Sequence, residues 1–117
     1  MFVIELKAEG RAVGTIGFQA VDMENRRAEV GYSLARRLWG HGLAAEALML
    51  LCGYAFDTLG MERLEGRHDS RNPASGRVLE KAGFTREGVE KRSVILKGER
   101  ADMVWYALLK PDYKRED

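Results

Sequence analysis

The segment Arg37-Leu38-Trp39-Gly40-His41-Gly42-Leu43-Ala44 decides how this 117-residue chain is interpreted. It places two glycines, one residue apart, directly before a long apolar run that is typical of a helix. Glycine lets backbone N–H groups turn outward, and the helix N-terminus adds about half a positive charge. Such a loop can hold a phosphate by its backbone, and it can equally be a tight connection that packs a helix onto a sheet. The loop alone leaves both interpretations open.

The residues after this loop predict two helices. Residues 43–59 are apolar nearly all round, which indicates a largely buried helix that ends at Gly60. Asn72 and Pro73 predict the start of a second helix, because Asn caps free N–H groups and Pro suits the first helical position. We expect Gly83 to end that helix.

The remaining apolar segments predict six strands. Residues 2–6, 13–21 and 28–34 precede the loop and form an expected antiparallel meander, residues 63–68 lie between the helices, and residues 85–96 and 101–109 close the chain. The third and fourth strands flank a helix in one crossover, so they are expected to be parallel. The last strand is apolar on both faces and is therefore expected to be central in its sheet. The prediction is an α/β fold: one domain over residues 1–117, with a mixed, mostly antiparallel sheet in the order β-β-β-α-β-α-β-β.

Composition excludes several classes of partner. Lys and Arg total 19 against 18 for Asp and Glu, so the net charge of +1 gives no case for nucleic acid or an anionic membrane. The longest apolar stretch, residues 47–56, is about half of what a membrane span needs. The N-terminus lacks the pattern of a signal peptide. The single cysteine, Cys52, rules out an internal disulfide and suits a reducing cytoplasm. We expect a cytoplasmic protein without a metal site.

Two nucleotide-binding motifs compete for the glycine loop. A Walker A loop is excluded, because Gly-Lys-Ser/Thr is missing. A dinucleotide fingerprint fits formally as Gly40-x-Gly42-x-x-Ala45, with Glu62 and Glu65 about twenty residues further on. However, residues 35–39 separate the preceding strand from the first glycine, and three antiparallel strands come before the motif. A dinucleotide-binding fragment is therefore disfavoured.

With its neighbours, Arg37-x-x-Gly40-x-Gly42-x-Ala44 resembles the acetyl-CoA pyrophosphate loop of the GNAT N-acetyltransferases. Residues 28–32 (Ala-Glu-Val-Gly-Tyr), residues 72–84 and Asp102 are similar to the RimJ/RimL-like branch, which acetylates protein N-termini and related amines. The resemblance covers nearly the whole chain. It implies acetyl transfer from acetyl-CoA to an amine, by direct attack in a ternary complex. The acceptor, a small-molecule or peptide amine, cannot be named from the sequence.

The resemblance also implies which residues bind acetyl-CoA. They are Arg37, Gly40, His41, Gly42, Leu43 and Ala44 in the loop, Tyr32, Ser33 and Leu34 in the preceding strand, and Asn72 and Ser75 at the second helix start. We expect the third and fourth strands to splay near residues 32–34 and free N–H groups for the pantetheine and the thioester carbonyl. Trp39 is assigned to packing.

The candidate catalytic residues are Glu29 and Ser75. Glu29 shares a strand face with Gly31 and Ser33, which leaves room for a water or substrate, so it is the candidate base. An ion-paired glutamate near Arg27 is the alternative. Ser75 could reach the sulfur, or it could be a polar first-turn serine.

The general acid is unassigned. Many GNAT enzymes carry a tyrosine seven residues after the asparagine, and Leu79 stands there instead. Ser75, a water or His41 could serve, or no acid is needed. A non-catalytic CoA-binding regulatory or assembly module is the alternative function.

Complete members of this family carry a strand and two helices before the first strand found here. A fragment, a start site placed too late, or a natural short form whose partner supplies the missing surface all remain open. In each case residues 2–6 become an exposed apolar edge strand, and such edges tend to pair with another chain. We therefore predict a homodimer joined through this strand or the uncovered face.

Overall fold

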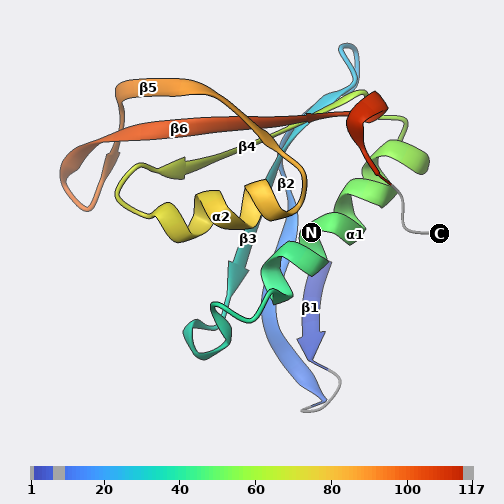
Figure 1. Cartoon of the computed structure of the whole chain (residues 1–117), viewed down its shortest axis with the longest axis horizontal. Helices are drawn as coiled ribbons and strands as arrows, with labels where there is room; N and C mark the ends of the chain where they lie inside the picture. Colours follow the sequence, from blue (N-terminus) through green and yellow to red (C-terminus); the bar gives the residue numbers. More distant parts are fainter. Residues whose placement is uncertain (1, 7–9, 115–117) are drawn as a thin grey trace.

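A computed structural model describes residues 2–6 and 10–114 (Figure 1). It contains one six-stranded sheet in the order β1-β2-β3-β4-β6-β5. The strands are β1 Phe2–Leu6, β2 Arg11–Asp22, β3 Arg27–Leu34, β4 Arg63–Asp69, β5 Thr85–Leu96 and β6 Glu99–Leu109. The helices are α1 Leu43–Asp57 and α2 Pro73–Lys81, and the two short 3-10 turns are η1 Arg36–Leu38 and η2 Lys110–Asp112. The predicted element order is confirmed, and only the two 3-10 turns were not predicted.

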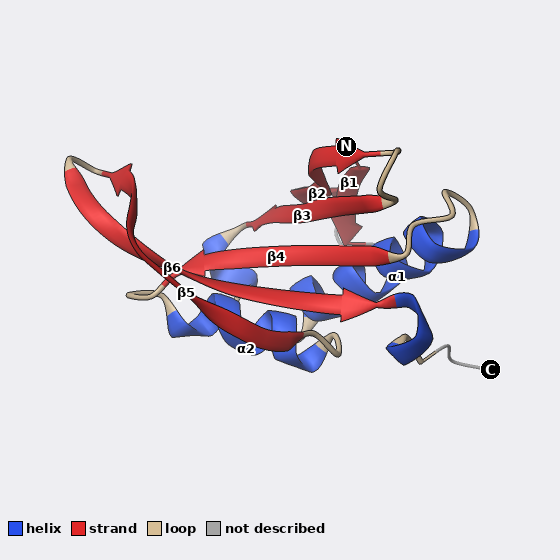
Figure 2. Cartoon of the chain, turned by 90° about the horizontal axis from the view of Figure 1, so that it is seen from above, coloured by secondary structure: helices blue, strands red, loops and turns tan. Residues whose placement is uncertain are grey.

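Both helices lie on the same face of the sheet, and no described helix covers the other face (Figure 2). The core forms between them: Leu48, Cys52 and Phe56 of α1 are at most 1% exposed and pack with β3, β4 and β6. Burial raises the pKa of the Cys52 thiol to about 12, so this residue is an unreactive part of the core. In the described part of the chain, no helix is long and apolar enough to cross a membrane.

The topology confirms three predictions about the strands. β3 and β4 are parallel, and β6 lies in the sheet interior between β4 and β5. The β3–β4 pairing covers only three residue pairs, from Arg27↔Arg63 to Glu29↔Glu65. Beyond Glu29 the two strands separate, as expected. The break leaves the second half of β3 paired with β2 alone.

The helix ends agree with the sequence signals in part. Gly83, at φ +100°, ends α2: its N–H bonds to the Glu80 carbonyl at 3.0 Å, and the Phe84 N–H bonds to the Leu79 carbonyl at 3.0 Å. This is a Schellman ending. α1 ends at Asp57, two residues before the predicted end, and Gly60 supplies the turn with φ +72°.

The capping role expected for Asn72 was wrong. Asn72 occupies the position before α2, but its side chain makes no capping hydrogen bond. Its backbone carbonyl instead accepts the Ser75 N–H at 3.3 Å. The amide side chain is therefore not used to hold the helix start.

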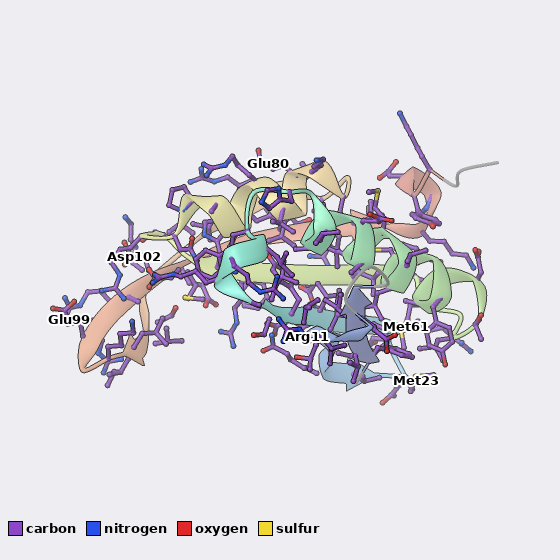
Figure 3. The ribbon with its side chains drawn as sticks, turned by 90° about the horizontal axis from the view of Figure 1, so that it is seen from below. Arg11, Met23, Met61, Glu80, Glu99 and Asp102 are labelled. Atoms are coloured by element: carbon purple, nitrogen blue, oxygen red, sulfur yellow. The ribbon has the colours of Figure 1, made fainter. Side chains whose placement is uncertain are left out.

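The β5–β6 hairpin extends beyond the helices as an arm that carries Glu99 and Asp102 (Figure 3). The pairing shifts register between Glu90 and Val94, where Arg92 has φ +52°. Asp102 Oδ1 accepts the Arg92 backbone N–H at 2.8 Å, and this bond holds the pKa of Asp102 below its ordinary value. Asp102 thus has a structural role, which is to hold the bulge of β5.

Candidate functional site

A cleft of about 460 Å³ lies where the end of β3, the start of α1 and one side of α2 meet. It brings together most of the residues predicted to bind acetyl-CoA: Tyr32, Ser33, Leu34, Gly40, Gly42, Leu43, Ala44, Asn72 and Ser75. These come from three segments separated in the sequence by up to about forty residues. The fold therefore gathers them into a single elongated site.

The glycine loop gives the cleft an anion-binding end. Gly40 and Gly42 have φ +82° and +78°, a conformation that side chains with a Cβ rarely adopt. Gly42 directly precedes α1 and offers no side-chain cap, so the first N–H groups of that helix remain available. A Cβ added to Gly42 would lie 3.1 Å from the Lys81 Nζ. The N-terminus of α1 and the Lys81 ammonium group together can bind a phosphate.

The gap between β3 and β4 gives the cleft a row of backbone hydrogen-bonding groups. The Ala35 N–H bonds to the Val13 carbonyl of β2 at 2.8 Å. Because hydrogen-bonding direction alternates along an antiparallel strand, the N–H groups of Leu34 and Tyr32 point away from β2, toward the gap. These are the groups that the sequence predicted to be freed.

The Tyr32 side chain crosses from β3 to α2. Its hydroxyl lies 2.8 Å from Ser75 Oγ and 3.3 Å from the Ser75 carbonyl oxygen. Burial raises the pKa of Tyr32, so the phenol is protonated at neutral pH. The predicted role of Tyr32 concerned its backbone N–H group and not its side chain. Strand alternation was the available signal, since Tyr32 shares the helix-covered face with Val30.

Glu29 lies on the opposite face of the sheet, where β3 and β4 begin to separate. Its Oε2 accepts a hydrogen bond from Arg67 Nε at 3.0 Å, and its side chain is only 12% exposed. Glu29 is therefore ion-paired, as the alternative interpretation had it, but its partner is Arg67 and not Arg27. Arg27 instead binds Glu65 Oε1 at 2.6 Å, because the parallel register places Glu65 beside Glu29.

Arg37 and His41 differ in position from the other predicted acetyl-CoA ligands. Arg37 and His41 are exposed and do not line the cleft, whereas Arg77 does. Arg71 is engaged by Asp69 and Glu99, at 2.7 and 2.9 Å.

Trp39 and Lys81 line the cleft, although neither was predicted to bind acetyl-CoA. Trp39 is 53% exposed and donates its indole N–H to the Leu34 carbonyl at 2.8 Å, so its assignment to packing was wrong. Lys81 follows Ala74 by seven residues, which places both on one side of α2, and this spacing was the signal that could have found it.

The chain matches the family model of the acetyltransferase (GNAT) domain over residues 1–85. It belongs to the GNAT acetyltransferase family. The RimJ/RimL-like resemblance is supported by its relatives.

Among curated proteins, the chain is 38% identical over 112 residues to an uncharacterized N-acetyltransferase p20 of Bacillus licheniformis, covering 96% of this chain and 63% of that protein. It is 33% identical over 84 residues to the ribosomal protein uS5-alanine N-acetyltransferase of Escherichia coli, covering 72% of this chain and 43% of that one. A crystal structure of a probable acetyltransferase superposes with a TM-score of 0.85 at 33% identity, covering 90% of this chain and 59% of the other. The chain thus spans about 40 to 65% of these proteins.

Proposed function

We propose that this chain binds acetyl-CoA in the cleft and transfers its acetyl group to an amine by direct attack in a ternary complex. One observation carries the proposal: a cleft brings a glycine-flanked helix N-terminus and Lys81 together with Tyr32, Ser33 and Leu34, the part of β3 that has separated from β4. A diphosphate and an extended amide-containing arm need this combination of groups. The family assignment supports the same conclusion.

Each part of the cleft has a proposed role in binding. The backbone of residues 40–44 holds the diphosphate, with Lys81 beside it. The N–H groups of Tyr32 and Leu34 bond to the pantetheine arm and to the thioester carbonyl, where one donor can contribute roughly 3–4 kcal/mol in acyl transfer. Asn72, whose amide is not used as a cap, is available to the same arm. Arg37 and His41 are proposed as outer neighbours of the phosphates.

Glu29 and Ser75 are the proposed catalytic residues, on opposite sides of the gap. Ammonium groups are not nucleophiles, and α-amino groups have a pKa of about 7.7–8.0. Glu29 therefore accepts one proton from the amine, directly or through water. The N–C bond forms as the C–S bond breaks, a second proton of the amine ends on the thiol, and Ser75 donates a hydrogen bond to the departing sulfur. The products are an amide, CoA thiol and one proton released to solvent.

A second candidate function is CoA binding without turnover, in a regulatory or assembly role. The observation that favours it is the Arg67 guanidinium, which covers the Glu29 carboxylate. In that case acetyl-CoA stabilises the protein against heat and no amine accelerates thiol release.

A thiol-release assay with a panel of amines tests the proposal. We expect Glu29→Gln to lower kcat by about 100-fold, the lower range for a positioned base. Glu65→Gln is the matched control, because Glu65 is the register partner of Glu29, 15% exposed and also ion-paired. It should change kcat less than twofold. Equal rates for wild type and Glu29→Gln would remove Glu29 from its role.

The acceptor class and the assembly are also proposals. The Escherichia coli relative is named for acetylating a ribosomal protein alanine, which supports a protein N-terminus or a similar small amine as acceptor. We further propose a homodimer, since β1 is an edge strand with Phe2 and Val3 44% and 64% exposed. We also propose a cytoplasmic location, because Cys52 is a free thiol and free thiols suit a reducing compartment.

A further inference from the structure

Three side chains form a stacked cluster on the sheet face that the helices leave uncovered. Glu29, Arg67 and Trp105 come from the neighbouring strands β3, β4 and β6, and Arg67 is the direct register partner of Trp105. The Arg67 guanidinium carbon lies 5.2 Å from the centre of the Trp105 ring, and Arg67 Nε lies 3.0 Å from Glu29 Oε2. The guanidinium is therefore held between a carboxylate and an aromatic face.

The cluster lies beside the proposed base, at the point where β3 and β4 separate. Glu29↔Glu65 is the last residue pair of the β3–β4 ladder, so Glu29 stands at the mouth of the gap that opens toward the cleft. Its carboxylate is 12% exposed while Arg67 is 32% exposed. Arg67 is thus the more exposed partner of this ion pair.

Few interactions hold the Arg67 side chain, and each of them depends on its positive charge. Within residues 2–6 and 10–114, the Arg67 side chain makes one hydrogen bond, from Nε to Glu29, and it also stacks on the Trp105 ring. Arg27 and Arg63, by contrast, are bound to Glu65 at 2.6 and 3.3 Å, and Arg63 also binds Glu87. Arg67 is thus the least constrained of the arginines along this boundary.

We propose that Glu29 and Trp105 form a cation site for the acceptor's protonated primary amine, and that Arg67 occupies this site in its place until the acceptor arrives. The inference rests on the proposed function and adds the acceptor's charge to it. An alkylammonium satisfies both partners as Arg67 does, with an ion pair to the carboxylate and a cation–π contact to the indole. When the alkylammonium is bound at this site, its nitrogen lies against the Glu29 carboxylate, which accepts its proton. An uncharged amine gains neither contact.

Competition between Arg67 and the amine makes the proposal measurable. Ethylamine is charged at neutral pH, and 2,2,2-trifluoroethylamine is similar in size but uncharged. We expect Arg67→Ala to lower the KM for ethylamine at least fivefold, with the KM for trifluoroethylamine and for acetyl-CoA within twofold of wild type. Arg67→Lys keeps the wild-type pattern. If Arg67 only positions Glu29, Arg67→Ala lowers kcat for both amines and leaves the ratio of their KM values unchanged, which overturns the proposal.

Binding without turnover separates this inference from the proposed function. Ethyltrimethylammonium cannot be acetylated, and calorimetry measures its affinity directly. We expect Arg67→Ala to bind it at least fivefold more tightly than wild type, and Trp105→Phe, which keeps a ring of weaker cation–π strength, to bind it less tightly than wild type. Equal affinities in wild type and Arg67→Ala contradict the cation site, whether or not any amine is acetylated. Absence of thiol release with every amine contradicts the proposed function alone. Far-UV circular dichroism checks that each variant is folded.

Discussion

The Tyr32 hydroxyl lies 2.8 Å from Ser75 Oγ, and this contact joins β3 to the first turn of α2 on the wall of the cleft. The pKa of Tyr32 is raised by burial, so the phenol keeps its proton through neutral and mildly alkaline pH. A phenol that donates to Ser75 Oγ leaves the serine hydrogen free to point elsewhere. We propose that it points at the sulfur of the leaving thiol, which gives Tyr32 a positioning role at a site where Leu79 cannot supply an acid.

This pair predicts coupled losses of activity. Tyr32→Phe and Ser75→Ala should each lower kcat about tenfold. The kcat of the double variant should be no lower than that of the less active single variant, because both changes remove one shared interaction. Steady-state kinetics at saturating acetyl-CoA measures this. Tyr54→Phe is the control, since Tyr54 is a partly exposed phenol on α1 outside the cleft. Fully additive losses would mean that the two hydroxyls act independently.

The hairpin arm predicts a pH-dependent stability difference. The pKa of Asp102 is lowered by the Arg92 backbone N–H, so the stabilisation by its charge is complete above its ordinary pKa and is lost as pH falls through the lowered value. Asp102→Asn keeps an acceptor oxygen but has no charge. We expect wild type to melt about 2 °C above Asp102→Asn at pH 7, with the gap closing toward pH 2.

The control for this experiment is Glu90→Gln, which removes a carboxylate that makes no hydrogen bond within the described residues. Its melting temperature should follow wild type across the range. A gap between wild type and Asp102→Asn that stays constant down to pH 2 would contradict the assigned role of the charge.

The edge strand predicts the state of assembly. Val3 is 64% exposed on β1, which pairs with β2 on one side only in the described part of the chain. Sedimentation at micromolar concentration should show a dimer for wild type and a monomer for Val3→Lys, because a charge on an edge strand opposes pairing. Val21→Lys, at an exposed valine of β2, should remain dimeric. A wild-type monomer removes the prediction.

Local patterns were sufficient to predict the order of elements and the glycine loop. The 43–59 apolar run, Pro73 and Gly83 fixed the helices because helix signals depend on nearby residues. The parallel pairing of β3 and β4 followed from the crossover between them, and the central place of β6 followed from its two apolar faces.

Side-chain partners across strands were less accessible. Arg67 and Glu29 are 38 residues apart, and only the register of β3, β4 and β6 brings the guanidinium to both the carboxylate and Trp105. Tyr32 and Ser75 are 43 residues apart and meet because α2 packs against the helix-covered face of the sheet. Lys81 reaches the glycine loop because α2 packs beside the start of α1. Such contacts depend on how the elements pack, which periodicity does not specify.

Calorimetric titration with acetyl-CoA measures whether the glycine loop binds the cofactor. Gly42 and Gly98 have nearly the same positive φ, +78° and +80°, which disfavours a side chain at both positions, while only Gly42 lies in the cleft. The account predicts saturable heat with acetyl-CoA for wild type and Gly98→Ala, at least tenfold weaker binding for Gly42→Ala, and no heat with NAD. Binding of NAD as tight as that of acetyl-CoA, or the same acetyl-CoA affinity in Gly42→Ala as in Gly98→Ala, would contradict it.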